Sequence, residues 1–194
     1  ESLEYEASYD HLTALPNRRT FEKKIRELIA EPTTEENCFT LFYIDIDSFK
    51  YINDTLGHTV GDKALIAITK RLVNIGINNS ILARIGGDEF CMVIRGYLND
   101  QQCLDLCTQL NGAVMVPFTI DTHKLYLSQT VGISRYPEDG TSYETLLQTA
   151  HIAMSMGKTS GGRKNNFKDG NFTQITKMRF IIQHGLKDAL DNHQ

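Results

Sequence analysis

The chain has 194 residues, of which 41% are hydrophobic and 23% are charged, so it can form one domain with a short appendage. Its formal net charge of −4 gives no basis for general nucleic-acid binding, which usually requires a basic surface, although a local cluster of cations can still hold a small anion. No run approaches the roughly 18 apolar residues that a membrane-spanning helix needs, and we expect no signal peptide.

Hydrophobic periodicity predicts helices and strands that alternate along one mixed α/β domain. In chain order, we expect a helix at 18–30, a strand at 39–46, helices at 48–55 and 60–76, strands at 81–86 and 89–95, a helix at 100–113, strands at 115–121 and 124–135, and a helix at 142–157. Residues 160–171 predict a loop with one more short strand, and residues 173–191 predict a last amphipathic helix. The two glycines at 86–87 predict a hairpin, which we place in the middle of the sheet.

Four cysteines, at positions 38, 91, 103 and 107, lack the spacing of metal ligands. We expect them to be reduced thiols, which suits a cytoplasmic protein. The chain has no tidy boundary at either end. We therefore expect it to be a piece of a larger protein, either cytoplasmic or the cytoplasmic part of a membrane-associated one.

Two acidic residues close the strand predicted at 39–46. Asp45 and Asp47 are two residues apart, so on an extended strand both side chains lie on the same side. Carboxylates at the end of an apolar strand lose hydration energy unless something compensates them. A metal ion, a salt bridge and plain exposure to water all remain open at this point.

A second acidic pair, Asp88 and Glu89, follows the glycines of the predicted hairpin. Glycines have no side chain, so a ligand can approach the backbone of such a turn closely. Magnesium prefers hard oxygen ligands, typically one or two carboxylates together with water and substrate phosphate. Asp45 and Asp88, with Glu89 nearby, would meet that need; a solvated acidic hairpin tip is the alternative.

The helix predicted at 48–55 begins with Ser48 and carries Lys50 in its first turn. Helix N-terminal amides bind phosphate oxygens, and the lysine adds a positive charge. Further along, Asn53 and Asp62 have the chemistry to read a guanine edge, because a carboxylate accepts from N1–H and the 2-amino group. The alternative for Asp62 is to cap the second helix.

Three basic or titratable residues have less specific patterns. His58 lies in a glycine-flanked loop, where histidine is more often structural than catalytic. Lys158 and Arg163 lie at and after the end of a helix, where they can bind phosphate or simply form a solvated basic segment.

Taken together, these motifs resemble those of a GGDEF domain, the catalytic module of diguanylate cyclases. The similarity runs from the entry motif Asp10-His-Leu-Thr-Ala-Leu-Pro-Asn-Arg18 to about Asn166. It includes Asp45-Ile-Asp-Ser-Phe-Lys50, Asn53-Asp-Thr-Leu-Gly-His58 with Gly61-Asp62, and Arg84-Ile-Gly-Gly-Asp-Glu-Phe90. Because several motifs occur in the right order, the resemblance is specific.

The resemblance implies an α/β (α+β) domain with a palm-like nucleotidyl-cyclase fold, in which a central mixed five-stranded sheet is flanked by helices and carries a catalytic β-hairpin. It also implies that two GTP molecules are condensed into cyclic di-GMP with release of pyrophosphate. Each domain would hold one GTP, and two domains would meet face to face as a homodimer. The cofactor would be Mg²⁺, with Mn²⁺ as a substitute.

The resemblance also implies roles for individual residues. The catalytic residues would be Asp88, Glu89 and Lys50. The metal ligands would be Asp45, Ile46 and Asp88. The substrate-binding residues would be Asn53, Asp62, His58, Ser48, Phe49, Arg84, Gly86, Gly87 and Lys158.

Three features depart from the family pattern. The helix near the end reads Ala150-His-Ile-Ala-Met-Ser-Met-Gly-Lys158, where the family has Ala-Asp-x-Ala-x-Tyr-x-Ala-Lys. Arg163 lies one place late for its expected phosphate contact. The family's product-inhibition motif Arg-x-x-Asp is represented by Ile77 and Ser80, so we expect no inhibition through that site.

These observations leave two candidate functions, an active diguanylate cyclase or a catalytically silent GTP-binding domain that regulates a downstream cyclic di-GMP phosphodiesterase. We expect residues 1–170 to form the GGDEF domain and residues 171–194 a helix that links it to an EAL phosphodiesterase domain. An upstream sensory domain is the other expected fusion partner. We expect no nucleic-acid partner and no membrane insertion.

Overall fold

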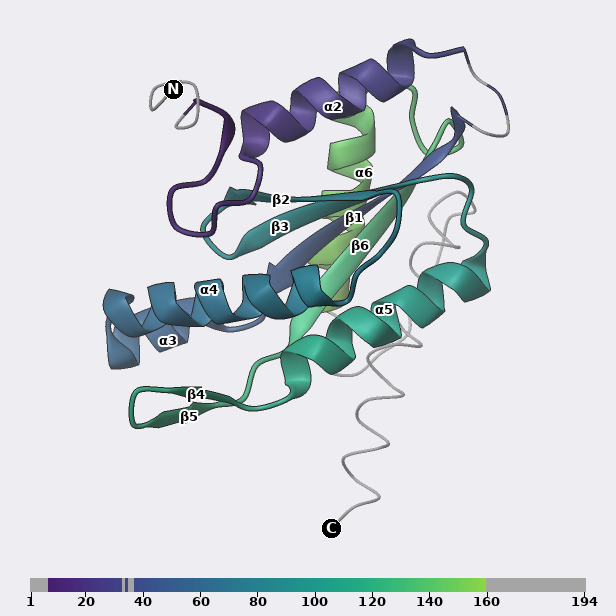
Figure 1. Cartoon of the computed structure of the whole chain (residues 1–194). Helices are drawn as coiled ribbons and strands as arrows, with labels where there is room; N and C mark the ends of the chain where they lie inside the picture. The colour runs from purple at the N-terminus through teal and green to yellow at the C-terminus, as the bar shows by residue number, and fades with distance from the viewer. Residues whose placement is uncertain (1–6, 33, 35–36, 160–194) are drawn as a thin grey trace.

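The computed structural model describes residues 7–32, 34 and 37–159. The predicted loop and helix after residue 160, and with them Arg163 and the proposed linker, lie outside the described residues. The elements are α2 (Arg18–Ala30), β1 (Phe39–Ile46), α3 (Phe49–Leu56), α4 (His58–Asn74), β2 (Ser80–Gly86), β3 (Glu89–Arg95), α5 (Asp100–Met115), β4 (Phe118–Ile120), β5 (His123–Leu125), β6 (Gln129–Tyr136) and α6 (Tyr143–Thr159). Figure 1 shows their arrangement.

Side-chain caps explain where two of the helices begin. The Asn17 side chain accepts a hydrogen bond of 3.0 Å from the Thr20 amide at the start of α2. At the start of α5, Asn99 and Gln102 form a reciprocal capping box. Both helices therefore begin within a residue of the positions that the sequence predicts.

The central sheet has the strand order β2-β3-β1-β6 among the described residues. Neighbouring strands pair antiparallel throughout it, so the expected mixture of parallel and antiparallel strands is not found in this part of the chain. The β2–β3 hairpin lies at one edge of this sheet and not in its middle, because β1 inserts between β3 and β6. Of the five strands expected before residue 160, the one at 115–121 is represented by β4, which pairs with β5 and not with the central sheet. The further short strand expected after residue 160 lies outside the described residues. The α/β fold class itself is confirmed.

Strand β1 is buried along its whole length because helices cover both faces of the sheet (Figure 1). Side chains alternate between the faces of a strand. Phe42, Ile44 and Ile46 join the core beneath α3, α4 and α5, whereas Leu41 and Tyr43 join a second core with α2 and α6. Asp45 belongs to the same face as Tyr43, the side of α6.

The strand predicted at 124–135 is two strands. Residues 123–125 form β5, which pairs only with β4 in a small separate hairpin, and β6 begins at Gln129. The turn of the small hairpin uses Asp121 in the left-handed region, with φ +54°. The hydrophobic pattern does not reveal the break between β5 and β6, because the apolar side chains at 125 and 127 are buried in the same core as those of β6.

Helix α6 packs unusually close to β6. A Cβ atom at Gly132 would lie 1.9 Å from the Ala150 carbonyl oxygen and 2.5 Å from the Met154 amide nitrogen, so only glycine fits there. This close contact directs the end of α6, with Lys158, toward the end of β1. None of the helices in the described ranges is long and apolar enough to cross a membrane.

Candidate active site at the end of the central sheet

Three acidic residues meet where β1 and the β2–β3 hairpin end. Asp45 lies directly opposite Glu89 in the antiparallel register, and the Ile46 amide donates a 3.2 Å hydrogen bond to the Asp88 carbonyl. Asp45 is only 6% exposed, whereas Asp88 and Glu89 are partly exposed. The structure therefore brings together the two strand ends that the sequence singled out.

Lys158 provides the cation that faces this acidic cluster. Its ammonium group donates a hydrogen bond to Oδ1 of Asp45 and forms an ion pair with it. The contact links residues 113 positions apart. It depends on α6 lying close to β6 at Gly132.

Burial raises the pKa of the Asp45 carboxyl above its usual value, and the hydrogen bond from Lys158 opposes that rise. The negative charges of Asp88 and Glu89 raise the pKa further. The single lysine therefore does not offset burial and the neighbouring acids. Additional positive charge at this point would favour the ionised form of all three carboxylates.

This donor set fits a hard divalent cation. Asp45 and Asp88 offer carboxylate oxygens, and Ile46 can contribute only its main-chain carbonyl. Within the described ranges, no group of three or more His, Cys, Asp or Glu side chains is arranged to hold a metal ion by itself. Magnesium, which commonly takes one or two carboxylates and completes its shell with water and phosphate, is compatible with that arrangement.

Asp47 does not join the cluster as the two-residue spacing suggested. It lies just beyond β1, where the strand pattern no longer applies. Its carboxylate accepts hydrogen bonds from the hydroxyls of Ser128, at 2.7 Å, and Thr130, at 2.6 Å. Nothing in the sequence indicated these partners, because they are more than 80 residues away from Asp47.

Arg84 braces the hairpin turn. Its Nε and Nη2 atoms donate to the Gly87 carbonyl at 3.0 and 2.8 Å, and Nη1 donates to Asp10 at 2.9 Å. Asp10 also accepts from the amide and hydroxyl of Thr13, and the pKa of its carboxyl is lowered because these bonds and Arg84 outweigh its burial. The motif resemblance predicts Arg84 as a phosphate ligand, but nothing in the sequence indicates that Arg84 also connects the entry motif, through Asp10, to the hairpin turn, through Gly87.

The predicted guanine-reading residues lie on the pair of helices α3 and α4. A Cβ atom on Gly61 would lie 1.9 Å from Oδ1 of Asn53, so the asparagine side chain packs directly against the glycine. Asp62 follows Gly61 and is exposed. Helix α4 begins at His58 after Gly57, so the alternative in which Asp62 caps this helix is wrong.

The remaining predicted ligands lie at the start of α3, at the start of α4 and in the hairpin turn. Ser48 adopts the left-handed conformation, with φ +57°, and makes no side-chain capping bond. Phe49 is buried in the core beneath α3, so only its main chain can contact a nucleotide. The exposed residues of this group are Ser48, Lys50, His58, Gly86 and Gly87.

The altered part of α6 contacts the cluster indirectly. The exposed His151 ring lies edge-on to Tyr43, with ring centroids 5.1 Å apart and an interplanar angle of 66°. Burial, and then the charge of Glu89, raises the pKa of the Tyr43 hydroxyl. Tyr43 therefore connects the substituted position to one of the site acids, which the sequence alone did not indicate.

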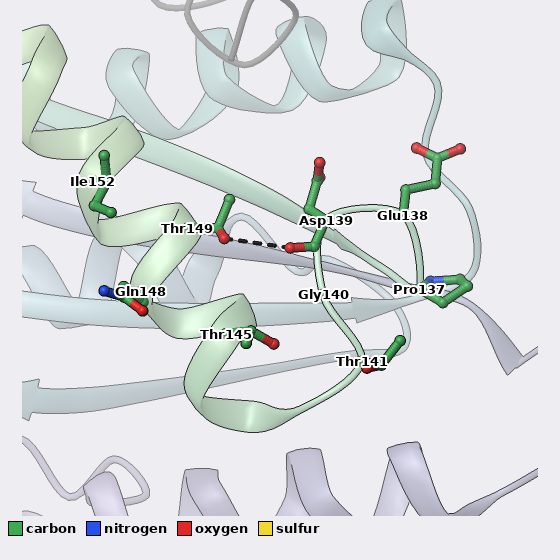
Figure 2. Close-up of a pocket in the computed structure, with 9 residues that line it drawn as sticks. All are labelled: Pro137, Glu138, Asp139, Gly140, Thr141, Thr145, Gln148, Thr149 and Ile152. Atoms are coloured by element: carbon green, nitrogen blue, oxygen red, sulfur yellow. Dashed lines mark hydrogen bonds between the residues drawn. The ribbon is translucent and has the colours of Figure 1, made fainter. Parts of the chain in front are cut away.

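A surface pocket elsewhere has different chemistry. It lies between the segment after β6 and the first half of α6, and Thr149 donates a 3.3 Å hydrogen bond to the Asp139 carbonyl across it (Figure 2). Asp45 pairs with Thr130 near the beginning of β6, so this pocket is at the other end of that strand. Its lining includes Glu138 and Asp139 but no lysine, arginine or histidine, which makes it unsuitable for a triphosphate.

The fold and the site define an α/β domain with an acidic, cation-facing centre at one end of an antiparallel sheet. The family model described as "Diguanylate cyclase, GGDEF domain" matches residues 7–164. The chain belongs to the GGDEF family, as its motifs indicated.

Relatives of known sequence agree with this assignment. The chain is 32% identical to the diguanylate cyclase TpbB of Pseudomonas aeruginosa over 97% of its own length and 43% of that protein. It is 30% identical to a bifunctional diguanylate cyclase/cyclic di-GMP phosphodiesterase, MucR, of the same species, over 97% of the chain and 27% of MucR. The chain therefore spans less than half the length of these relatives.

Solved structures show the same fold. The GGDEF domain of TpbB superposes with a TM-score of 0.71 at 31% identity and covers 78% of this chain and 89% of that one. A sensory box/GGDEF family protein from Caulobacter crescentus gives 0.72 at 32% identity, over 79% of this chain and 99% of that one. The palm-like cyclase fold expected from the sequence is thereby confirmed.

Proposed function

We propose that this domain is a diguanylate cyclase that condenses two GTP into cyclic di-GMP and releases pyrophosphate. The observation that carries the proposal is the gathering of Asp45, Asp88 and Glu89 at one end of the sheet, with Lys158 on Asp45. Family membership and the cyclase named among its relatives support the same activity.

Asp45, Asp88 and the Ile46 carbonyl would hold Mg²⁺, with Mn²⁺ as a substitute. When bound, the metal would supply positive charge that activates the attacking 3′-oxygen and neutralises charge on the phosphoryl oxygens. Lys158 and Lys50 would hold triphosphate oxygens as point charges. The amides at the start of α3, including those of Ser48 and Phe49, would donate to the same group.

Glu89 lies opposite Asp45 and would assist metal binding or accept the proton of the 3′-hydroxyl. Asn53 and Asp62 would read the guanine edge, with His58 beside them. Arg84 would act on the phosphates directly or by keeping Gly86 and Gly87 in the open turn that lets the triphosphate approach. The second possibility is favoured by the bonds from its guanidinium to Gly87 and Asp10.

Each domain would hold one GTP, so the two reacting centres would meet in a face-to-face homodimer. Bringing two bound substrates together in a fixed orientation removes much of the entropic cost of the bimolecular reaction. We expect the monomer to be inactive for this reason.

The test is turnover of GTP by the dimeric protein with Mg²⁺, followed by chromatographic detection of cyclic di-GMP. Asp88→Ala should reduce turnover at least about 10³-fold, because a carboxylate ligand is lost. Asp105→Ala changes an exposed acid on α5, a helix that contributes no candidate site residue; it is the matched control and should leave the rate unchanged. Confirmed dimer that binds GTP but makes no product would contradict the proposal.

A second candidate is a silent GTP-binding domain that controls a cyclic di-GMP phosphodiesterase. It is favoured by the substitutions in α6, where His151 contacts Tyr43 beside Glu89, and by the description of another relative, NbdA of P. aeruginosa, as a cyclic di-GMP phosphodiesterase. Under this proposal, GTP would bind without turnover and alter the activity of a fused EAL domain.

Both candidates share a domain organisation. We propose residues 1–170 as the GGDEF domain and residues 171–194 as a connection to an EAL domain, with a sensory domain upstream, in a protein whose cyclase domain faces the cytoplasm. The bifunctional description of MucR, of which this chain covers only 27%, supports such a fusion.

A further inference from the structure

The two acids that follow each other on the first strand have separate partners. We propose that Asp47 is a positioning residue that holds the loop between β1 and α3 in place through Ser128 and Thr130. These three residues are called the loop clasp below. The inference rests on the proposed function, since it concerns how that nucleotide site keeps its shape.

The clasp has three hydrogen bonds. Ser128 Oγ donates to Asp47 Oδ2 at 2.7 Å, Thr130 Oγ1 donates to Oδ1 at 2.6 Å, and the Asp47 amide donates to the Ser128 carbonyl at 2.9 Å. Each carboxylate oxygen thus receives a hydroxyl of its own. Hydrogen bonds to an ionised acceptor are stronger than those between neutral groups.

The partners of Asp47 belong to a fixed part of the molecule. Thr130 lies within β6, directly opposite Asp45 in the register with β1. Two residues further along, Gly132 holds β6 against α6. The clasp therefore connects the loop to the same strand that positions Lys158 over Asp45.

The main chain on either side of Asp47 includes the groups that the proposed site uses. Ile46, whose carbonyl is a candidate metal ligand, comes before it, and its amide is bonded to the Asp88 carbonyl. Ser48 comes after it in the left-handed conformation, with φ +57°. A serine in that conformation is strained and needs support from its surroundings.

Helix α3 then begins at Phe49 without a side-chain cap from Ser48. Its first amides and Lys50 are the candidate phosphate ligands. The clasp on one side and the Ile46–Asp88 bond on the other would fix the chain between metal site and helix start. Loss of the clasp would let this loop relax and would weaken nucleotide binding without removing any ligand.

The competing role for Asp47 is direct metal binding, which its spacing from Asp45 suggested. The two roles differ in how mutations combine. If Asp47 acts through the hydroxyls, then Asp47→Ala and the double variant Ser128→Ala/Thr130→Val should have similar effects, and combining them should add little. A metal ligand would lose its function in Asp47→Ala whether or not the hydroxyls are present.

The measurement is calorimetric binding of 3′-deoxy-GTP with Mg²⁺, an analogue that lacks the attacking hydroxyl and cannot be cyclised. We expect Asp47→Ala and the double hydroxyl variant each to weaken binding about tenfold, and the triple variant to be no more than about twofold weaker than either. Asp47→Asn should recover part of the loss, because its amide can still accept from one hydroxyl and donate to the other.

A cooperative thermal unfolding transition for each variant would establish that it is folded. Thr108→Val, which removes an exposed hydroxyl of α5, is the matched control and should bind the analogue normally. A double hydroxyl variant with wild-type affinity, or an Asp47→Asn variant as weak as Asp47→Ala, would overturn the inference alone. Wild-type protein that does not bind the analogue would overturn the proposed function and the inference together.

Discussion

The two halves of the candidate site differ in how firmly the fold holds them. At the sheet end, Asp45 is buried, Lys158 is bonded to it, and Arg84 and Asp10 brace the neighbouring turn. On α3 and α4, Lys50, His58 and Asp62 are exposed, and Asn53 packs directly against Gly61. The proposed metal-binding side is therefore preorganised by a sheet buried on both faces, whereas the proposed base-reading side depends on the packing of two surface helices.

The largest effect should come from Gly132, which holds α6 to the sheet. Gly132→Val would place side-chain atoms where the Ala150 carbonyl and the Met154 amide lie, and helix backbone cannot move aside cheaply. We expect a loss of about 3 kcal/mol or more in the free energy of unfolding, measured by urea denaturation.

Gly112→Ala is the control for this change. Gly112 lies in α5 with nothing within 4 Å of an added Cβ atom, so alanine should raise helix stability by about 0.5–1 kcal/mol. Equal stabilities of Gly132→Val and the wild type would show that α6 does not dock on β6 as described. The sheet-end half of the candidate site would then not be held by that contact.

On the helical side, Gly61→Ala should affect substrate binding more than folding. The added methyl group would meet the end of the flexible Asn53 side chain, which can rotate away. We expect the KM for GTP to rise about tenfold, equivalent to about 1.4 kcal/mol, while the midpoint of thermal unfolding changes little.

The background variant Asn53→Ala makes the test specific. Once the asparagine amide is absent, Gly61→Ala should add no further increase in KM, because the group that it displaces is gone. An additional increase in that background would mean that Gly61 serves the site in some other way than by accommodating Asn53.

The sequence predicted most of the fold because the strongly periodic segments are also the buried ones. The strand at 39–46 and the helix at 18–30 have the predicted bounds. The position of the hairpin at the sheet edge could not be predicted, because strand order depends on pairings such as Tyr43 with Cys91 and Gly132 that periodicity does not encode.

Within the candidate site, local motifs predicted which strand ends lie together but not the hydrogen-bond partners of their side chains. Asp45 and Glu89 lie opposite each other because the strands that carry their two motifs end at the same edge of the sheet. The contacts of Asp47 with Thr130 and of Arg84 with Asp10 connect residues 83 and 74 positions apart. One sequence gives no information on such pairs, so for Asp47 it leaves a metal ion, a salt bridge and exposure to water open as alternatives.

A smaller effect concerns the stability of the acidic cluster itself. Burial and two neighbouring acids raise the pKa of Asp45, so its ionised form is less stable in the folded chain than in the unfolded chain. A raised carboxyl pKa contributes stability below the unfolded value, near 3.8, and that contribution is lost as pH rises through the folded value. Asp45→Asn should therefore raise the Tm of the metal-free protein at pH 7, by about 2 °C, and have no such benefit near pH 3.

Asp105→Asn, at an exposed position of α5, serves as the control and should show no pH-dependent gain. Asp45→Asn should at the same time abolish cyclic di-GMP formation, since stability and metal binding make opposite demands on this carboxylate. A decrease in Tm at pH 7 would mean that the ion pair with Lys158 stabilises the fold by more than the burial of the Asp45 charge destabilises it. The charges at the sheet end would then make a net stabilising contribution.

The smallest expected effect is that of the product on the rate. Cyclic di-GMP is a dianion, and residues 74–83 contain no charged side chain with which to bind it. Ser80 donates its hydroxyl proton to the Ile77 carbonyl at 2.7 Å, so the segment satisfies its own polar group without a ligand. Initial rates of pyrophosphate release should stay within about 20% of the control value as micromolar product is added.

The double variant Ile77→Arg/Ser80→Asp restores the charges of the family motif at these positions and should introduce inhibition. If the wild-type rate falls by half at low micromolar product, the product must bind elsewhere, and the cations at Lys50 and Lys158 in the candidate active site would be the first place to examine.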